Sequence, residues 1–274
     1  MKKIIALVLL TALLAVGFAG CSSANTGKLD SIKESGKITM YTDPNFAPFE
    51  FLTNGTEVVG VDIEIAKAIA AELGVELEIK EAAFDSIILS LATGKGDMAL
   101  SGFTITEKRK ESVDFSTPYI NSVQYLIIMK DAEELVLEDL AGKKVGVATG
   151  YTGQFLMEYE MEKDEEEDYT GVLFEKDTTL TEYKSAVDAT LALTSGKIDA
   201  VVMDEYVAKN IAANNENVKV IPLKYSDGTL AEEEYGVAIA KGNEDLLEKI
   251  NAVVERLISE GKIEEWVVKF SEAN

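Results

Sequence analysis

Residues 61–80 read VDIEIAKAIAAELGVELEIK and contain two structural patterns in succession. Over residues 61–73 the apolar residues recur at the spacing of one helix face, and Gly74 follows them directly, as glycines that end helices do. From residue 75 to residue 80 apolar and polar residues alternate, which is typical of a strand with one buried face. A helix that passes into a strand through one glycine is part of a βαβ unit. The stretch therefore predicts an α/β fold with parallel strands.

Strand and helix patterns alternate in the same way along most of the chain. Strands are expected at residues 37–43, 97–101, 144–148, 198–203 and 234–240. Helices are expected at residues 84–93, 152–161, 180–194, 205–213, 244–260 and 262–271. The units fall into two groups, at about 37–118 and 144–222, which predicts two lobes. A return of the last segment to the first group would complete the first lobe.

The N-terminus has the layout of a secretory signal peptide. Lys2 and Lys3 precede an uncharged apolar run from Ile4 to Phe18, which is shorter than the ~20 residues needed to span a bilayer. Small residues lead from this run to Cys21, the one cysteine in the sequence. Cleavage before Cys21 leaves 254 of the 274 residues, enough for one large domain or two smaller ones. Residues 22–32 are small and polar and are expected to form a flexible tether.

Composition excludes several classes of function. The chain has 49 acidic and 26 basic residues and a formal net charge of −23, which argues against nucleic acid and anionic lipid as partners. It has no histidine, which excludes a histidine general base and histidine metal ligands. No phosphate loop, nucleophile elbow or metal-ligand cluster is present, so no cofactor and no metal are expected. The acidic run at 158–168 lacks the spacing of a calcium loop and is expected to be a solvated helix end and loop.

Polar residues follow several of the expected strands. Asp43 and Ser101 end two strands of the first group, and Thr152 and Asp204 follow strands of the second group. Ligands of open α/β sheets bind beyond the carboxyl ends of the strands, so these residues are candidates for a binding site. Each of them taken alone is equally well explained as a cap of the helix that follows.

A set of segments in both halves of the chain carries a family resemblance. They are YTDPNFAPFEF at 41–51, VGVDIEIA at 59–66, Phe84-Asp85, GDMALSGFTITEKR at 96–109, VDFSTPY at 113–119, GVATGYTG at 146–153, GKIDAVVMD at 196–204 and YGVAIAK at 235–241. Together these segments resemble the bacterial extracellular solute-binding proteins of the polar amino-acid ABC-transporter family, family 3. The segment that ends at Cys21 resembles the lipobox of bacterial lipoproteins, with Cys21 as the lipidated residue. An ordinary signal peptide cut near a free cysteine is the alternative.

The resemblance implies a two-lobed, periplasmic-binding-protein-like fold of type II, with two crossover strands as its hinge. The crossovers are expected near residues 121–123 and 234–236. The first lobe would then comprise residues 33–121 plus 235–274, and the second lobe residues 122–234.

The resemblance also implies a role for each matching residue. Arg109 corresponds to the arginine that binds the α-carboxylate of an amino acid, and a guanidinium can do so through two parallel hydrogen bonds. Asp204 corresponds to the carboxylate that neutralises the α-ammonium group. The hydroxyl donors would be Thr104 and Thr152, and Gly102, beside Ser101, would let the backbone approach the ligand closely. The aromatic walls of the side-chain pocket would be Phe46 and Phe84, and Asp43 would lie at its far end. Tyr151 stands where the family usually has a small residue.

The resemblance implies binding rather than catalysis. We expect a lipid-anchored monomer on the extracellular face of the membrane, or on its periplasmic side in a Gram-negative cell, that passes a free amino acid to ABC permease subunits. An acceptor-only carboxylate at Asp43 ranks arginine or lysine first, glutamine or cystine second, and glutamate or aspartate last. Two alternatives stay open: an enzyme on the same fold, such as a prephenate/arogenate-type dehydratase, and a sensory ectodomain.

Overall fold

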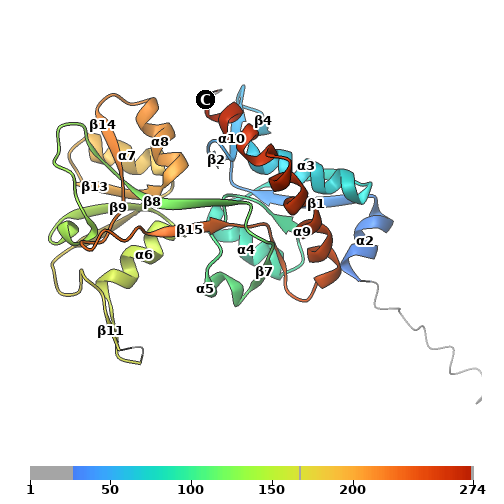
Figure 1. Cartoon of the computed structure of the whole chain (residues 1–274), viewed down its shortest axis with the longest axis horizontal. Coiled ribbons are helices and arrows are strands. Elements are labelled where there is room, and N and C mark those ends of the chain that lie inside the picture. Colours follow the sequence, from blue (N-terminus) through green and yellow to red (C-terminus); the bar gives the residue numbers. More distant parts are fainter. Residues whose placement is uncertain (1–26, 167, 273–274) are drawn as a thin grey trace, which may run out of the picture.

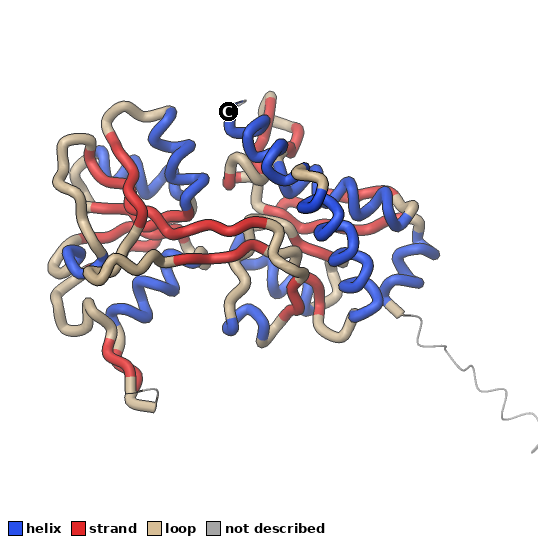
Figure 2. Tube along the Cα trace, in the orientation of Figure 1, coloured by secondary structure: helices blue, strands red, loops and turns tan. Residues whose placement is uncertain are grey.

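The computed structural model describes residues 27–272 except residue 167, and these residues form two lobes joined by two extended strands (Figures 1 and 2). Each lobe is built on one large sheet with helices packed against it. The predicted two-lobed α/β fold is confirmed. None of the helices within the described residues is long and apolar enough to cross a membrane.

The first lobe is built on a five-stranded sheet in the order β5-β1-β6-β16-β7. Its strands are β1 (Lys37–Thr42), β5 (Glu76–Glu81), β6 (Met98–Ala99), β7 (Val113–Phe115) and β16 (Ala238–Ala240). Strand β1 pairs in parallel with β5 and β6, whereas β16 pairs antiparallel with β6 and β7. Because β16 comes from the end of the chain, the C-terminal segment returns to the first lobe.

The four longest helices of the first lobe are α3 (Val61–Leu73), α4 (Phe84–Ala92), α9 (Glu244–Ser259) and α10 (Lys262–Glu272). Of these, α3 and α4 pack on the sheet, while α9 and α10 pack on α3 and on each other. In α3 the residues Ile63, Ala66 and Ile69 are fully buried, as their spacing predicts. Gly74 ends α3 in the left-handed region, with φ at 70°, and its N–H bonds to the last free carbonyls of the helix.

The second lobe is built on a sheet in the order β12-β9-β13-β8-β14. Its strands are β8 (Ile120–Met129), β9 (Lys144–Ala148), β12 (Thr179–Tyr183), β13 (Ala200–Asp204) and β14 (Val218–Pro222). Its α-helices are α6 (Thr152–Met161), α7 (Ala186–Thr194) and α8 (Glu205–Ala213). A second apolar core, which includes Leu126, Val145, Met157 and Val202, lies on one face of this sheet.

Two strands cross between the lobes side by side (Figure 1). They are the start of β8 and the short strand β15 (Glu232–Tyr235), which pair antiparallel. The register places Ile120 opposite Tyr235 and Ser122 opposite Glu233. The hinge strands therefore bring residues that are far apart in sequence next to the contact between the lobes.

Smaller elements complete the two lobes. They are β2 (Asn45–Phe46), β3 (Glu50–Thr53), β4 (Glu57–Val59), α5 (Glu107–Lys110), the 3-10 helix Leu137–Leu140, β10 (Lys163–Asp164) and β11 (Tyr169–Thr170).

The expected flexible tether at 22–32 is wrong over its second half. Residues Lys28–Ser35 form helix α2, in which Leu29 and Ile32 are buried. The helix packs on α9 and β1, so the first lobe begins before residue 33. The two apolar residues have helical spacing, but polar neighbours hide that pattern in so short a segment. Residues 1–26, with the predicted signal peptide and Cys21, lie outside the described residues.

The expected helix over 180–194 is wrong at its start. Strand β12 pairs in parallel with β9, and α7 begins only after Ser185. The Ser185 hydroxyl accepts a hydrogen bond from Asp188 N at 3.1 Å, which caps the helix. The expected strand over 234–240 is likewise two strands, β15 and β16, because the chain leaves one sheet and joins the other.

The acidic run at 158–168 is only partly solvated. Glu160 is 1% exposed. Its carboxylate accepts hydrogen bonds from Tyr169 OH at 2.7 Å, Tyr225 OH at 2.8 Å and Val172 N at 3.1 Å. These three donors offset the cost of burying the charge, which makes Glu160 a structural carboxylate rather than a surface one.

Candidate functional site

Polar side chains of both lobes meet where the lobes face each other. Asp43 follows β1 and Ser101 follows β6 in the first lobe. Asp204 is the last residue of β13 and Thr152 the first residue of α6 in the second lobe. Asp43, Ser101 and Asp204 are buried, although each is polar. Strand ends from two sheets thus supply the site.

Arg109 is buried between the lobes on the short helix α5. Thr106 caps this helix, and its hydroxyl accepts from Arg109 N at 3.2 Å. The guanidinium Nη1 donates to Thr104 O at 2.8 Å, and Nη2 donates to Gly150 O of the second lobe at 3.1 Å. Nη1 also lies 3.5 Å from Thr152 Oγ1, at the limit for a hydrogen bond. The guanidinium therefore forms hydrogen bonds to both lobes.

Aromatic rings and carboxylates surround the guanidinium. Its central carbon lies 5.4 Å from the ring centres of Phe84 and Phe103. Burial lowers the pKa of Arg109 to about 10, and the charges of Asp204 and Glu233 oppose this shift. Arg109 therefore remains positively charged at neutral pH.

Two threonine hydroxyls connect the lobes. Thr152 Oγ1 donates to Thr104 Oγ1 at 2.6 Å, and Thr104 Oγ1 donates to Glu233 Oε2 at 2.7 Å. The hydroxyl of Thr104 thus lies between the second lobe and a carboxylate of the hinge.

Asp204 belongs to a buried network that the sequence analysis predicts only in part. Gln124 Nε2 donates to Asp204 Oδ1 and, at 3.1 Å, to Glu233 Oε1. Burial raises the pKa of Asp204 to about 6, while the hydrogen bond from Gln124 and the charge of Arg109 lower it. Gln124 and Glu233 are not among the predicted site residues. The signal for Gln124 is a polar residue directly before the apolar run YLIIM at 125–129. Nothing in the sequence of Glu232-Glu233-Glu234 distinguishes the middle glutamate.

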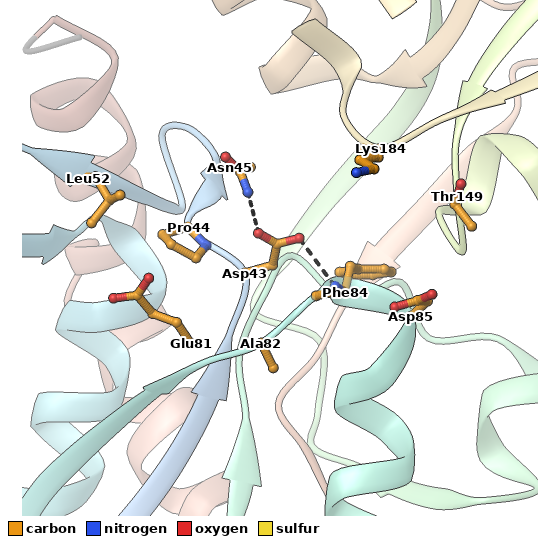
Figure 3. A pocket seen from close by; sticks show the side chains of 11 residues that line it. Asp43, Pro44, Asn45, Leu52, Glu81, Ala82, Phe84, Asp85, Thr149 and Lys184 are labelled. Atoms are coloured by element: carbon orange, nitrogen blue, oxygen red, sulfur yellow. Dashed lines mark hydrogen bonds between the residues drawn. The ribbon is translucent and has the colours of Figure 1, made fainter. Parts of the chain in front are cut away.

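The opposite end of the site is open. Asp43 accepts hydrogen bonds from Asn45 Nδ2 and, at 3.2 Å, from Phe84 N, and burial raises its pKa (Figure 3). Beside it lies a cavity of about 650 Å³ whose lining includes Thr149 and Lys184 of the second lobe. This cavity gives the Asp43 end access to solvent.

Three aromatic rings of the site pack against one another through Tyr151. Phe46 and Phe84 come from the first lobe, and Tyr151 comes from the second. The ring centre of Tyr151 lies 5.8 Å from that of Phe46 and 4.4 Å from that of Phe84. Gly102, with φ at 56°, lies against Phe46, where an added Cβ would come within 2.2 Å of the ring. A side chain at position 102 would therefore displace one aromatic wall.

Two buried acids, Glu50 and Asp62, accept hydrogen bonds from Ser101 and Gly102. Ser101 Oγ donates to Glu50 Oε1 at 2.9 Å, and Gly102 N donates to Asp62 Oδ2 at 2.9 Å. Burial, and then the charge of Asp62, raise the pKa of Glu50 well above its usual range. Burial raises the pKa of Asp62 to about 6. A hydrogen bond between the two carboxyl groups further raises the pKa of Glu50 and lowers that of Asp62.

The predicted residues thus come together in two groups. Thr104, Arg109, Thr152 and Asp204 meet at the interlobe network. The others belong to the first lobe, where Asp43 and Phe84 line the cavity: Asp43, Phe46, Phe84, Ser101 and Gly102. Within the described residues no three histidine, cysteine or acidic side chains are arranged to hold a metal ion.

The bacterial extracellular solute-binding proteins, family 3, match this sequence over residues 38–273. The chain belongs to this family. Among family members, the arginine-binding extracellular protein ArtP of Bacillus subtilis is 32% identical over 98% of both chains. The L-cystine-binding protein TcyJ of Escherichia coli is 29% identical over 92% of this chain and 88% of its own.

Solved structures show the same fold. The amino-acid ABC transporter substrate-binding protein AbpA of Streptococcus pneumoniae, bound to L-arginine, superposes with a TM-score of 0.78 at 32% identity, covering 89% of this chain and 98% of its own. The relatives are substrate-binding transport proteins, and the prediction that this family 3 protein is not an enzyme is confirmed.

Proposed function

We propose that this protein captures a free L-amino acid between its lobes and delivers it to the permease subunits of an ABC importer. The observation that carries the proposal is a buried pair of opposite charges, Arg109 of the first lobe and Asp204 of the second. An amino-acid backbone has the complementary charges, because its carboxylate can accept two hydrogen bonds from a guanidinium and its ammonium can donate to a carboxylate. Both partners are needed, since a zwitterion loses its water on burial.

In this proposal the amino acid stabilises the closed arrangement of the lobes. Arg109 and Thr104 already contact Gly150 and Thr152 across the lobe boundary. A ligand that contacts both sides binds the closed form more tightly and shifts the equilibrium towards it. The permease would bind this closed monomer and open it.

We rank arginine or lysine first as ligands, glutamine or cystine second, and glutamate or aspartate last. Two buried carboxylates, Asp43 at the side-chain end of the site and Asp204 at the Arg109 end, accompany one buried cation, Arg109. This excess of negative charge favours a ligand whose side chain is also cationic. The arginine named for ArtP and bound to AbpA supports the first rank, and the cystine named for TcyJ supports the second.

We also propose the division into lobes at residues 33–121 plus 235–274 and 122–234, with α2 added to the first lobe. The strand order of the two sheets supports this division.

A panel of single amino acids tests the proposal. The mature protein is heated with each amino acid in turn, and the melting temperature is measured, followed by titration calorimetry of the best ligands. We expect arginine or lysine to raise the melting temperature most, because ligands of the native state stabilise it by mass action. If no amino acid raises it and none binds in the calorimeter, the proposed function is wrong.

We further propose that Cys21 carries a lipid anchor and that residues 1–20 are removed as a signal peptide. Two acyl chains are enough for stable membrane attachment. The replacement Cys21→Ala is expected to abolish acylation and to release any cleaved protein from the membrane. Fractionation and metabolic labelling with a palmitate analogue measure this, with Ser22→Ala as the neighbouring control. Equal labelling of Cys21→Ala and wild type would contradict the anchor.

A further inference from the structure

Glu233 is a buried acid on the hinge strand β15. Its neighbours Glu232 and Glu234 are exposed, whereas Glu233 is 6% exposed. Alternate residues of a strand point to opposite faces, so Glu233 alone of the three turns towards the contact between the lobes. A single carboxylate of an acidic run is thus brought to the ligand site by the pleat of the strand.

Both oxygens of Glu233 are engaged there. Oε2 accepts from Thr104 Oγ1 at 2.7 Å. Oε1 accepts from Gln124 Nε2 at 3.1 Å and from Tyr235 OH at 3.3 Å. The carboxylate therefore touches the first lobe, the other hinge strand and its own strand.

The carboxylates of Asp204 and Glu233 lie close together because they accept hydrogen bonds from the same donor. Gln124 Nε2 donates to both carboxylates. Two acceptors of one nitrogen lie within about 6 Å of each other at ordinary hydrogen-bond lengths. Burial, and then the charge of Asp204, raise the pKa of Glu233 above the usual carboxyl value. One of these acids therefore retains a proton more readily than an exposed carboxyl group does.

Several other charged or titratable groups lie on the elements that pack against Glu233. They are Arg109 of α5, Glu205 of α8 with its partner Lys209, Tyr235, and the exposed Glu232 and Glu234. Arg109 is the buried cation among them, and it has its own hydrogen bonds to Thr104 and Gly150.

We propose that Glu233 is a second carboxylate of the subsite for the ligand's ammonium group, and that it gives up its proton when that group binds. The inference rests on the proposed function. An ammonium group has three N–H donors, and Asp204, the Thr104 hydroxyl and Glu233 are acceptors that lie close together. In the free protein the protonated Glu233 carboxyl group donates its O–H to a neighbouring hydroxyl oxygen, that of Thr104 or Tyr235, since a hydroxyl can accept as well as donate. When the ammonium group binds, this O–H bond breaks, the proton passes to the buffer, and the ammonium group keeps all its protons.

This coupling makes capture pH-dependent with a defined sign. A bound cation favours the ionised form of a neighbouring carboxyl group, so the complex holds fewer protons than the free protein. Release of protons on binding means that affinity rises with pH, by up to about tenfold per pH unit for one proton. The rise stops once Glu233 is ionised in the free protein as well.

The experiment is titration calorimetry with L-arginine at pH 7 in phosphate and in Tris, two buffers with different ionisation enthalpies. The difference between the observed binding enthalpies counts the protons released. We expect wild type to release up to about one proton for each arginine bound. Glu233→Gln, which keeps an oxygen to accept from Thr104, should release less than half as many. Glu232→Gln and Glu234→Gln, which remove the same charge from the exposed positions of β15, should release as many as wild type.

Three outcomes overturn the inference while leaving the proposed function standing. They are arginine binding without proton release by wild type, an arginine affinity that stays constant between pH 6 and pH 8, and equal release by Glu233→Gln and wild type. If Glu233→Gln does not fold, Glu233→Asp keeps a titrating group and must still release protons. Failure of wild type to bind arginine or any other amino acid overturns the proposed function itself.

Discussion

The two ends of the ligand site are built in different ways. At the Arg109 end, side chains of both lobes and of the hinge are hydrogen-bonded to one another and buried. At the Asp43 end, the carboxylate is held only by first-lobe groups and borders a cavity of about 650 Å³. Under the proposed function, the first end would bind the part that all amino acids share, and the second end would bind the side chain that distinguishes them.

The largest effect is expected from Arg109→Lys, which alters the shared end. The charge remains, but the two parallel hydrogen bonds to a carboxylate are lost, and a charged hydrogen bond contributes about 1.5–3 kcal/mol. Affinity for every amino acid should fall by about 10- to 100-fold, as measured by titration calorimetry. Lys110→Arg, on the exposed side of α5, is the matched control. A change below about threefold would remove Arg109 from the site.

A smaller and selective effect is expected from Asp43→Asn at the other end. Asparagine can still accept from Phe84 N, but the charge is lost. Arginine and lysine should weaken about tenfold more than glutamine, because only the cations lose a charge pair. Asp85→Asn, an exposed acid that lines the same cavity, is the control. Should competition assays show glutamate bound more tightly than arginine and lysine, Asp43 does not face the ligand's side chain.

Glu50→Gln tests the support of the site rather than its contacts. A raised pKa means that the folded state holds the proton more tightly than the unfolded state, so this contribution to stability is present at low pH and is lost as pH rises through the folded pKa. Glutamine keeps the acceptor for Ser101 and removes the charge facing Asp62. The melting temperature should therefore rise by a few degrees at pH 8 and approach that of wild type near pH 5. An exposed control is Glu57→Gln. Equal shifts at both pH values would contradict charge repulsion between Glu50 and Asp62.

The smallest effect is expected from Lys184→Gln, which removes an exposed cation from the wall of the cavity. Arginine should bind about two- to threefold more tightly at low salt, and the gain should vanish at high salt, because exposed charges interact weakly and are screened. Lys197→Gln, away from the cavity, is the control. A gain that persists at high salt would indicate direct contact rather than a long-range field.

Local patterns predicted most of the elements but failed where two elements meet. The helix over residues 61–73 and the strand over 144–148 have the predicted bounds, because each buries one regular face. The strand β12 was hidden because its residues also fit the period of the helix that follows Ser185. The helix α2 was hidden because only two of its residues are apolar and buried.

The sequence by itself determined which family this protein belongs to, because motifs such as GDMALSGFTITEKR retain both residue type and spacing. It also named a set of polar and aromatic residues that the fold places between the lobes. Only the tertiary structure decided which acids of the chain are buried, because burial depends on strand pleat and on partners distant in sequence. Glu233 lies between two exposed glutamates and meets Thr104 because the segment around residue 104 pairs with the hinge strand β15. Its proton affinity is therefore a property of the fold rather than of the residue.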